Sequence, residues 1–167
     1  MPLVFRYSGG VSNSDPDSAL GGAMSNTELN AVAMNNLFDN ITFSEAISGD
    51  EEYRCLVLFA EGNSYSDVSI YMSSETSSAY TQLDMAVEGT NISSPNYTTI
   101  PDEDTAPDQS GWTETNFVHR NSGSKLVIGN MDTNDRIHLW FKRIVSINAE
   151  STSSDSGVIS VEYIQIT

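Results

Sequence analysis

The residue types that support nucleophilic catalysis are few in this chain. Its only histidines are His119 and His138, and its only cysteine is Cys55, which lies in the middle of an apolar run. A serine hydrolase needs a serine beside a histidine base and an orienting acid, and no G-x-S-x-G nucleophile elbow is present. A buried structural thiol explains Cys55 equally well. We therefore expect no catalytic residues and a protein that is not an enzyme.

Carboxylates are abundant, and they suggest two other chemistries. A glycosidase would need two acids facing each other across a cleft, whereas adjacent acids between prolines are usually solvated. Calcium is the stronger alternative, because hard oxygen ligands suit it, although no twelve-residue EF-hand pattern occurs. Turn formation explains the same acids, so we expect no cofactor or metal and leave a loop-bound Ca²⁺ open. The candidate groups are Asp15 with Asp17, Asp102 to Asp104 with Asp108, and Asp132 with Asp135.

Two tryptophans raise the possibility of glycan binding. Trp112 and Trp140 could stack on sugar rings, but a strand tryptophan more often fills a core or a subunit contact. Trp140 shares one face of a predicted strand with His138 and Lys142, so we expect it to be half-exposed.

Charge and length limit the partners. The chain has 167 residues, 23 Asp and Glu against 7 Lys and Arg, and a formal charge of −16. Such a surface repels phosphate, so we expect no nucleic-acid or anionic-membrane partner. The acids could serve solubility, or face a basic protein surface. No apolar run is long enough to span a membrane, and the first residues lack a secretory signal pattern. The length predicts one domain.

Period-two apolar patterns separated by turn residues predict strands almost throughout. Residues 53–60 are apolar on both faces, as in a central strand. Thr27 could cap a helical turn over 31–37, and 97–100 could form a short strand within a loop. We expect an all-β, antiparallel β-sandwich or jelly-roll-like domain over 27–167, preceded by a strand and extended arm over 1–26. The other strand candidates are 3–7, 68–72, 83–87, 115–119, 125–128, 136–147 and 158–166.

Several segments resemble small virion structural proteins of tailed bacteriophages. The most specific is Gly49-Asp50-x-Glu52-Tyr53-Arg54-Cys55, and the resemblance spans nearly the whole chain except residues 62–98. The remaining segments are Ser8-Gly9-Gly10, Asn13-Ser14-Asp15-Pro16, Leu20-Gly21-Gly22, Asn36-Leu37-Phe38-Asp39, Glu45-Ala46, Thr105-Ala106-Pro107, Leu126-Val127-Ile128-Gly129-Asn130 and Trp140-Phe141-Lys142-Arg143.

The resemblance implies a capsid decoration (cement) protein, made in the host cytoplasm and bound to the outer surface of the virion. Its implied partners are the major capsid protein and further copies of itself, as a trimer or another small homo-oligomer. A tail, neck or fibre-associated protein and a glycan-binding module remain alternatives. Within the motif, we expect Arg54 to pair with an acid while Tyr53 and Cys55 pack. The partner-contact candidates are Phe5, Arg6, Tyr7, Asp15, Asp17, Trp112 and Trp140.

Overall fold

The computed structural model describes residues 3–31, 33, 35–75, 78–93, 95–150 and 156–166. Strands dominate the described chain, and its one α-helix is short. None of its helices has the length and apolar character of a membrane span. The elements are β1 (Leu3–Tyr7), the 3-10 turn η1 (Pro16–Ser18), α1 (Phe43–Ser48), β2 (Asp50–Ala60), β3 (Ser64–Glu75), β4 (Thr81–Thr90), β5 (Glu114–Val118), β6 (Leu126–Met131), β7 (Arg136–Val145) and β8 (Gly157–Ile166).

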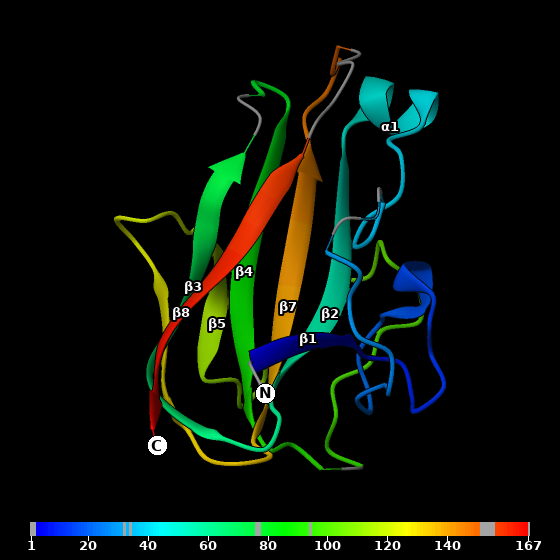
Figure 1. Ribbon diagram of the computed structural model, residues 1–167. Helices are drawn as coiled ribbons and strands as arrows, with labels where there is room; N and C mark the ends of the chain where they lie inside the picture. The colour runs from blue at the N-terminus through cyan, green and yellow to red at the C-terminus, as the bar shows by residue number, and fades with distance from the viewer. Residues whose placement is uncertain are drawn as a thin grey trace.

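The strands form two antiparallel sheets, which confirms the expected all-β sandwich. The larger sheet has the order β1-β2-β7-β4-β5, and the smaller has the order β6-β3-β8. The smaller sheet, with β3 and β8, lies in front of the larger one in Figure 1. Apolar residues at every second position of β2, β4 and β7 face the smaller sheet and form the main core.

The central position of β2 follows from its sequence. It pairs with β7 over ten residues and with β1 over five, so both of its edges are used. Leu56 and Leu58 point into the main core, whereas Tyr53 and Cys55 pack on the opposite face. A strand buried on both faces needs the continuous apolar run that residues 53–60 supply.

The outer face of the larger sheet carries a second apolar cluster. Trp140 and Trp112 stack there with ring centroids 5.7 Å apart, together with Cys55 and Ile100. Trp140 is fully buried, so the expectation of a half-exposed side chain was wrong. The β7 alternation placed it on the correct face, but that face is covered by Leu20 and by residues 97–112.

The segment of residues 8–26 lies against its own domain. Leu20 and Gly22 exchange backbone hydrogen bonds with the segment of residues 98–100, and the amide of Cys55 donates to the carbonyl of Ala19 over 2.7 Å. The arm that the sequence predicts therefore continues the edge of β2 beyond the five residues that pair with β1 (Figure 1).

Two local expectations between the arm and the strands differ from the structure. The described residues of 31–37 form turns and bends rather than a helix. The helix lies further on, over 43–48, where Thr42 and Glu45 form a reciprocal capping box. The expected strand over 97–100 is reduced to one isolated bridge, between Gly21 and Thr99.

Candidate functional site

A network of ion pairs lies at the end of the sandwich where β2 begins. Glu52 on β2 stands directly opposite Arg143 on β7, and the two side chains form an ion pair. The far side of the Arg143 guanidinium donates to the backbone carbonyl of Asp39 over 2.6 Å and to its carboxylate over 3.2 Å. The Phe38 ring lies 5.0 Å from this guanidinium. The segment before α1 is thus held to two neighbouring strands of the larger sheet.

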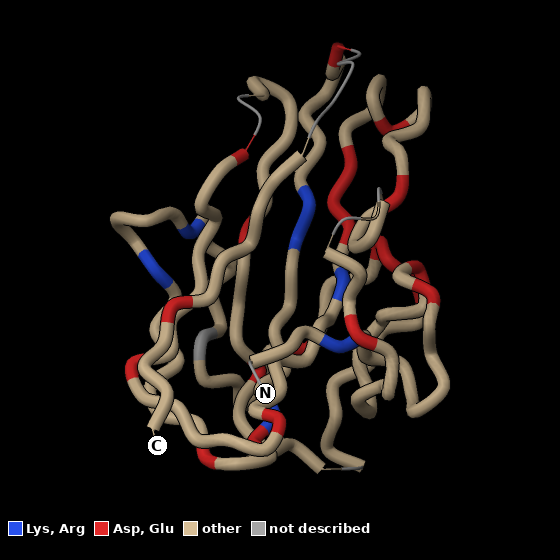
Figure 2. Tube along the Cα trace, viewed as in Figure 1, with Lys and Arg blue, Asp and Glu red and all other residues tan. Residues whose placement is uncertain are grey.

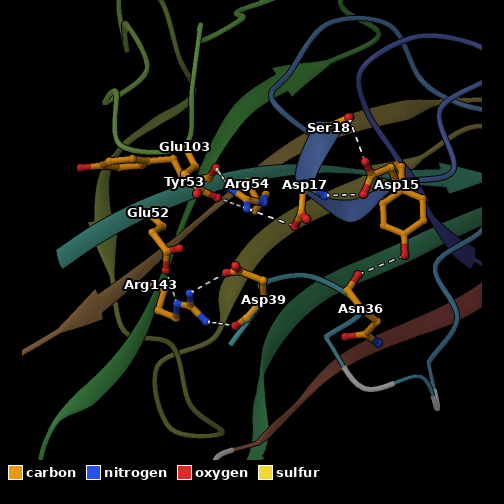
Figure 3. A network of polar contacts seen from close by, with 11 residues as sticks. Asp15, Asp17, Ser18, Asn36, Asp39, Glu52, Tyr53, Arg54, Glu103 and Arg143 are labelled. Carbon is orange, nitrogen blue, oxygen red and sulfur yellow. Dashed lines mark hydrogen bonds and ion pairs between the residues drawn. The ribbon is translucent and has the colours of Figure 1, made fainter. Parts of the chain in front are cut away.

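Arg54 is the second cation of this network, and no part of it is exposed to solvent. Its guanidinium binds Glu103 and contacts the Asp17 carboxylate over 3.4 Å (Figure 3). It also donates to the carbonyl of Tyr53 over 3.2 Å, and the Phe38 ring lies 5.6 Å away. The expected pairing of Arg54 with an acid is confirmed, and the pair joins the arm to the loop that contains Glu103.

The carboxylates of this network exceed the cations, and Glu52 is the most buried of them. Burial raises the pKa of Glu52, although its hydrogen bond to Arg143 acts in the opposite direction. Two sets of three acids share Glu52 and have carboxylate oxygens within 4.8 Å of one another; they are Asp39, Glu52 and Glu103, and Glu45, Asp50 and Glu52. Hard cations prefer such ligands, but Glu52 already binds Arg143. Of these residues, only Glu103 lies within a calcium group suggested by sequence, that of residues 102–104 with Asp108.

The arm is attached to β2 by a buried serine and a glycine. The Ser8 hydroxyl donates to the carbonyl of Cys55 over 2.7 Å and accepts from the amide of Gly21 over 3.0 Å. Gly21 has a φ of +88°, and a Cβ at this position would overlap the Thr98 carbonyl and lie 2.8 Å from the Trp140 ring. Only glycine allows the chain to pass this close to the sheet.

A second polar group lies beneath the arm, on the outer face of the larger sheet. The Glu88 carboxylate accepts from the indole N–H of Trp140 over 2.9 Å and from the amide of Thr98 over 2.8 Å. Burial lowers the pKa of His138, whose Nε2–H donates to the carbonyl of Gly22 over 3.0 Å. Burial also raises the pKa of the Cys55 thiol. A neutral imidazole and a protonated thiol suit packing and hydrogen bonding rather than nucleophilic chemistry.

The residues singled out as partner contacts fall into three places. Tyr7, Asp15 and Asp17 lie with the network, where Tyr7 is buried and donates to the carbonyl of Asn36 over 3.1 Å (Figure 3). Asp15 caps η1 by accepting from the amide of Asp17. Of these three, the two aspartates are exposed.

The other four candidates lie elsewhere. Phe5 packs against the main core from β1, and Arg6 on the same strand forms an ion pair with Glu61 over 3.2 Å. Trp112 and Trp140 lie beneath the covering segments on the outer face and offer no open aromatic platform. The structure therefore does not bring the seven candidates into one surface.

Sequence reasoning missed most of the network. Phe38, Asp39 and Arg143 all lie in segments that carry the virion-protein resemblance, but no role followed from their spacing. The available signal was cross-strand pairing, since an acid and an arginine near the ends of two long strands can stand opposite each other. Glu103 carried no such signal, because it lies in an acidic loop where solvated charge is the ordinary expectation.

Comparison of the chain with protein-family models, curated proteins and solved structures found no match.

Proposed function

We propose that this protein is a non-enzymatic virion structural protein, and that it decorates the outer surface of a tailed-phage capsid. The observation that carries the proposal is the convergence of the segments on which the resemblance rests. Residues 36–39, 49–55 and 140–143 meet around Arg54 and Arg143, although they are widely separated in sequence. Short segments that matched only by chance would not be expected to contact one another in the fold.

The chemistry of this unit supports a structural role. Its charged side chains bind one another, and Arg54 joins the arm, β2 and the loop at Glu103. A protein that braces a shell must keep its shape while it bears load, and buried multi-partner ion pairs fix one arrangement of the connected segments. The charge of −16 also suits a protein that stays outside the shell, because packaged genome would repel it.

The acidic end of the molecule is the face that we assign to the major capsid protein. Acids of the arm, of α1, of the start of β2 and of the loop around residue 103 gather on one side, at the right of Figure 2. Asp15, Asp17 and Asp104 are exposed there. A basic patch on the capsid surface would complement them and make binding sensitive to salt. This assignment makes use of Asp15 and Asp17 among the sequence candidates.

Copy number in purified virions tests the proposal most directly. Quantitative mass spectrometry against the major capsid protein should give about one copy per capsid subunit, or one oligomer per symmetry axis, as many weak contacts require. A handful of copies would instead place the protein in the tail or neck. Absence from virions would overturn both assignments and leave a glycan-binding role to be tested with sugar arrays.

The assigned face has its own test with a matched control. Asp104→Lys should weaken binding to empty capsids by about tenfold or more, because it places a like charge against the basic patch. Asp132→Lys makes the same change beside Asn134, whose amide binds the carbonyl of Ala60 at the opposite end of β2, and should bind as the parent does. Equal losses in both variants would show that only total charge matters and would overturn the assignment of this face.

A further inference from the structure

Strand β8 is an unprotected edge of the smaller sheet. It pairs with β3 over its full length, and among the described residues no strand pairs with its other edge. Both irregularities in the β3–β8 ladder add a residue to β3, so β8 itself runs regularly through ten residues. Alternate residues of such a strand direct their backbone N–H and C=O groups away from the sheet, and these groups can accept another strand.

The side chains of β8 lack the features that usually block edge pairing. The strand contains no proline and no lysine, which are the common protecting residues at sheet edges. Its outward face carries three apolar residues that are more than half exposed to solvent: Val158 at 53%, Ile164 at 60% and Ile166 at 52%. By contrast, the free side of β1 is occupied, because the carbonyl of Phe5 accepts from Leu29. Strand β8 also differs in length from the other two strands that end a sheet with an unpaired side, because β5 has five residues and β6 has six.

Charge indicates which partner this edge can accept. Glu162 is the only charged residue of β8, and its carboxylate already binds Lys125 and accepts from the Tyr71 hydroxyl over 3.0 Å. Figure 2 shows few charged positions along β8, while acids are dense at the right of the molecule and others lie on segments near β8. Two copies of a chain with a charge of −16 repel each other least where this neutral strand meets its counterpart.

We propose that β8 is a self-association edge at which a second copy of this chain adds its own β8 in antiparallel orientation. A two-fold axis through Val161 places Val158 of one copy opposite Ile164 of the other, and Ser160 opposite Glu162. The two smaller sheets then form one continuous six-stranded sheet with an apolar outward seam. An axis through Glu162 would instead oppose two carboxylates directly, which is unfavourable. The self-association edge is independent of the proposed virion role, because it concerns the purified protein alone.

The first experiment compares mass in solution before and after charge is added at the seam. Analytical ultracentrifugation of the full chain at about 100 µM should give a dimer, in the affinity range of a small interface. The double variant Val158→Glu/Ile164→Glu opposes like charges twice and should raise the dissociation constant about tenfold or more. Val127→Glu adds an acid on the 76%-exposed valine of β6, outside the seam, and should leave the dimer intact.

The second experiment tests the register. Val158→Lys/Ile164→Glu places a lysine opposite a glutamate at both ends of the seam, so it should dimerise at least as well as the parent. Val158→Lys/Ile166→Glu would do so only if the axis passed through Glu162, and its dimerisation would overturn the proposed register. A monomeric parent, or equal weakening by Val127→Glu, would overturn the self-association edge itself. Circular dichroism of each variant separates these outcomes from misfolding.

Discussion

The two sheets of this sandwich differ in how many of their faces are covered. The larger sheet is buried on both faces, by the smaller sheet on one side and by residues 20–22 and 97–112 on the other. The smaller sheet has one covered face, and its outward valines and isoleucines on β6 and β8 remain exposed. Irregular segments of the chain cover the outer face of the larger sheet, whereas the outer face of the smaller sheet keeps exposed apolar residues.

This difference also changes the role expected of the N-terminal arm. Seen from the sequence alone, a glycine-rich segment over 8–26 is well suited to reach a neighbouring subunit. In the structure its buried groups, Ser8, Ala19 and Gly21, are bonded to β2 or packed on the larger sheet. The arm therefore contributes to the stability of its own domain, and its exposed residues, among them Val11, Asp15 and Asp17, are left for a partner.

Deletion of residues 1–26 is the most severe test of this comparison. It removes β1 and uncovers the carbonyl and amide of Cys55, so we expect the cooperative unfolding transition to disappear. Thermal unfolding followed by near-ultraviolet circular dichroism measures this. A cooperative transition within about 5 °C of the full chain would show that the arm is dispensable for folding.

Single truncations on the two sheets should differ by several kcal/mol. Trp140→Ala empties a fully buried position that is stacked on Trp112, and it should lower the free energy of unfolding by about 3–5 kcal/mol. Val127→Ala on the open face of the smaller sheet should change it by less than about 0.5 kcal/mol. Urea unfolding gives both values. Similar losses in the two variants would contradict the difference in covering.

Sequence patterns predicted the strands well because strand formation here depends on local alternation. In β7, alternation predicts that Ile137, Leu139 and Phe141 lie on the face opposite Trp140, and all three lie in the main core. The helix was misplaced although its signal was local: the Thr42-x-x-Glu45 capping box precedes α1, whereas the asparagine-rich segment before it forms turns.

Contacts between distant segments could not be predicted in this way. Alternation told which face of β7 carries Trp140, but not that residues 20–22 and 97–112 cover that face. Likewise, the sequence suggested that Arg54 has an acidic partner, but the partners come from positions 37 and 49 residues away. Many exposed acids compete for that role in so acidic a chain, and only the folded geometry selects Asp17 and Glu103.

A methyl group added where the arm passes closest to the larger sheet should weaken the packing of the arm on that sheet without detaching the arm. Gly21→Ala introduces a Cβ that overlaps the Thr98 carbonyl, in addition to the strain of a positive φ. Gly10→Ala also introduces a side chain at positive φ, but no atom lies within 4 Å of its Cβ. We expect Gly21→Ala to cost about 1–3 kcal/mol more than Gly10→Ala in urea unfolding, which is the usual range for overpacking. Equal costs would mean that backbone strain alone matters and that the arm is free to shift.

The smallest expected effects are pH dependences of opposite sign on the two sheets. Burial raises the pKa of Glu52 in the folded state, so folding takes up a proton. The contribution of Glu52 to the free energy of unfolding is therefore fully present below the ordinary glutamate pKa, and it is lost as pH rises through the pKa of the folded state. Hydrogen bonds from Lys125 and Tyr71 lower the folded pKa of Glu162, so its contribution is present above the ordinary pKa and is lost as pH falls.

Glutamine variants of these two residues should reveal the two signs. Between about pH 7 and pH 4, the parent should gain stability relative to Glu52→Gln and lose stability relative to Glu162→Gln, as linkage requires. Urea midpoints measured across this range at constant ionic strength give both differences. Both residues are glutamates on β strands, so the change in side chain is matched and only the surroundings differ. Parallel curves for the two variants would mean that the net charge of the molecule, rather than the covering of each sheet, governs its response to pH.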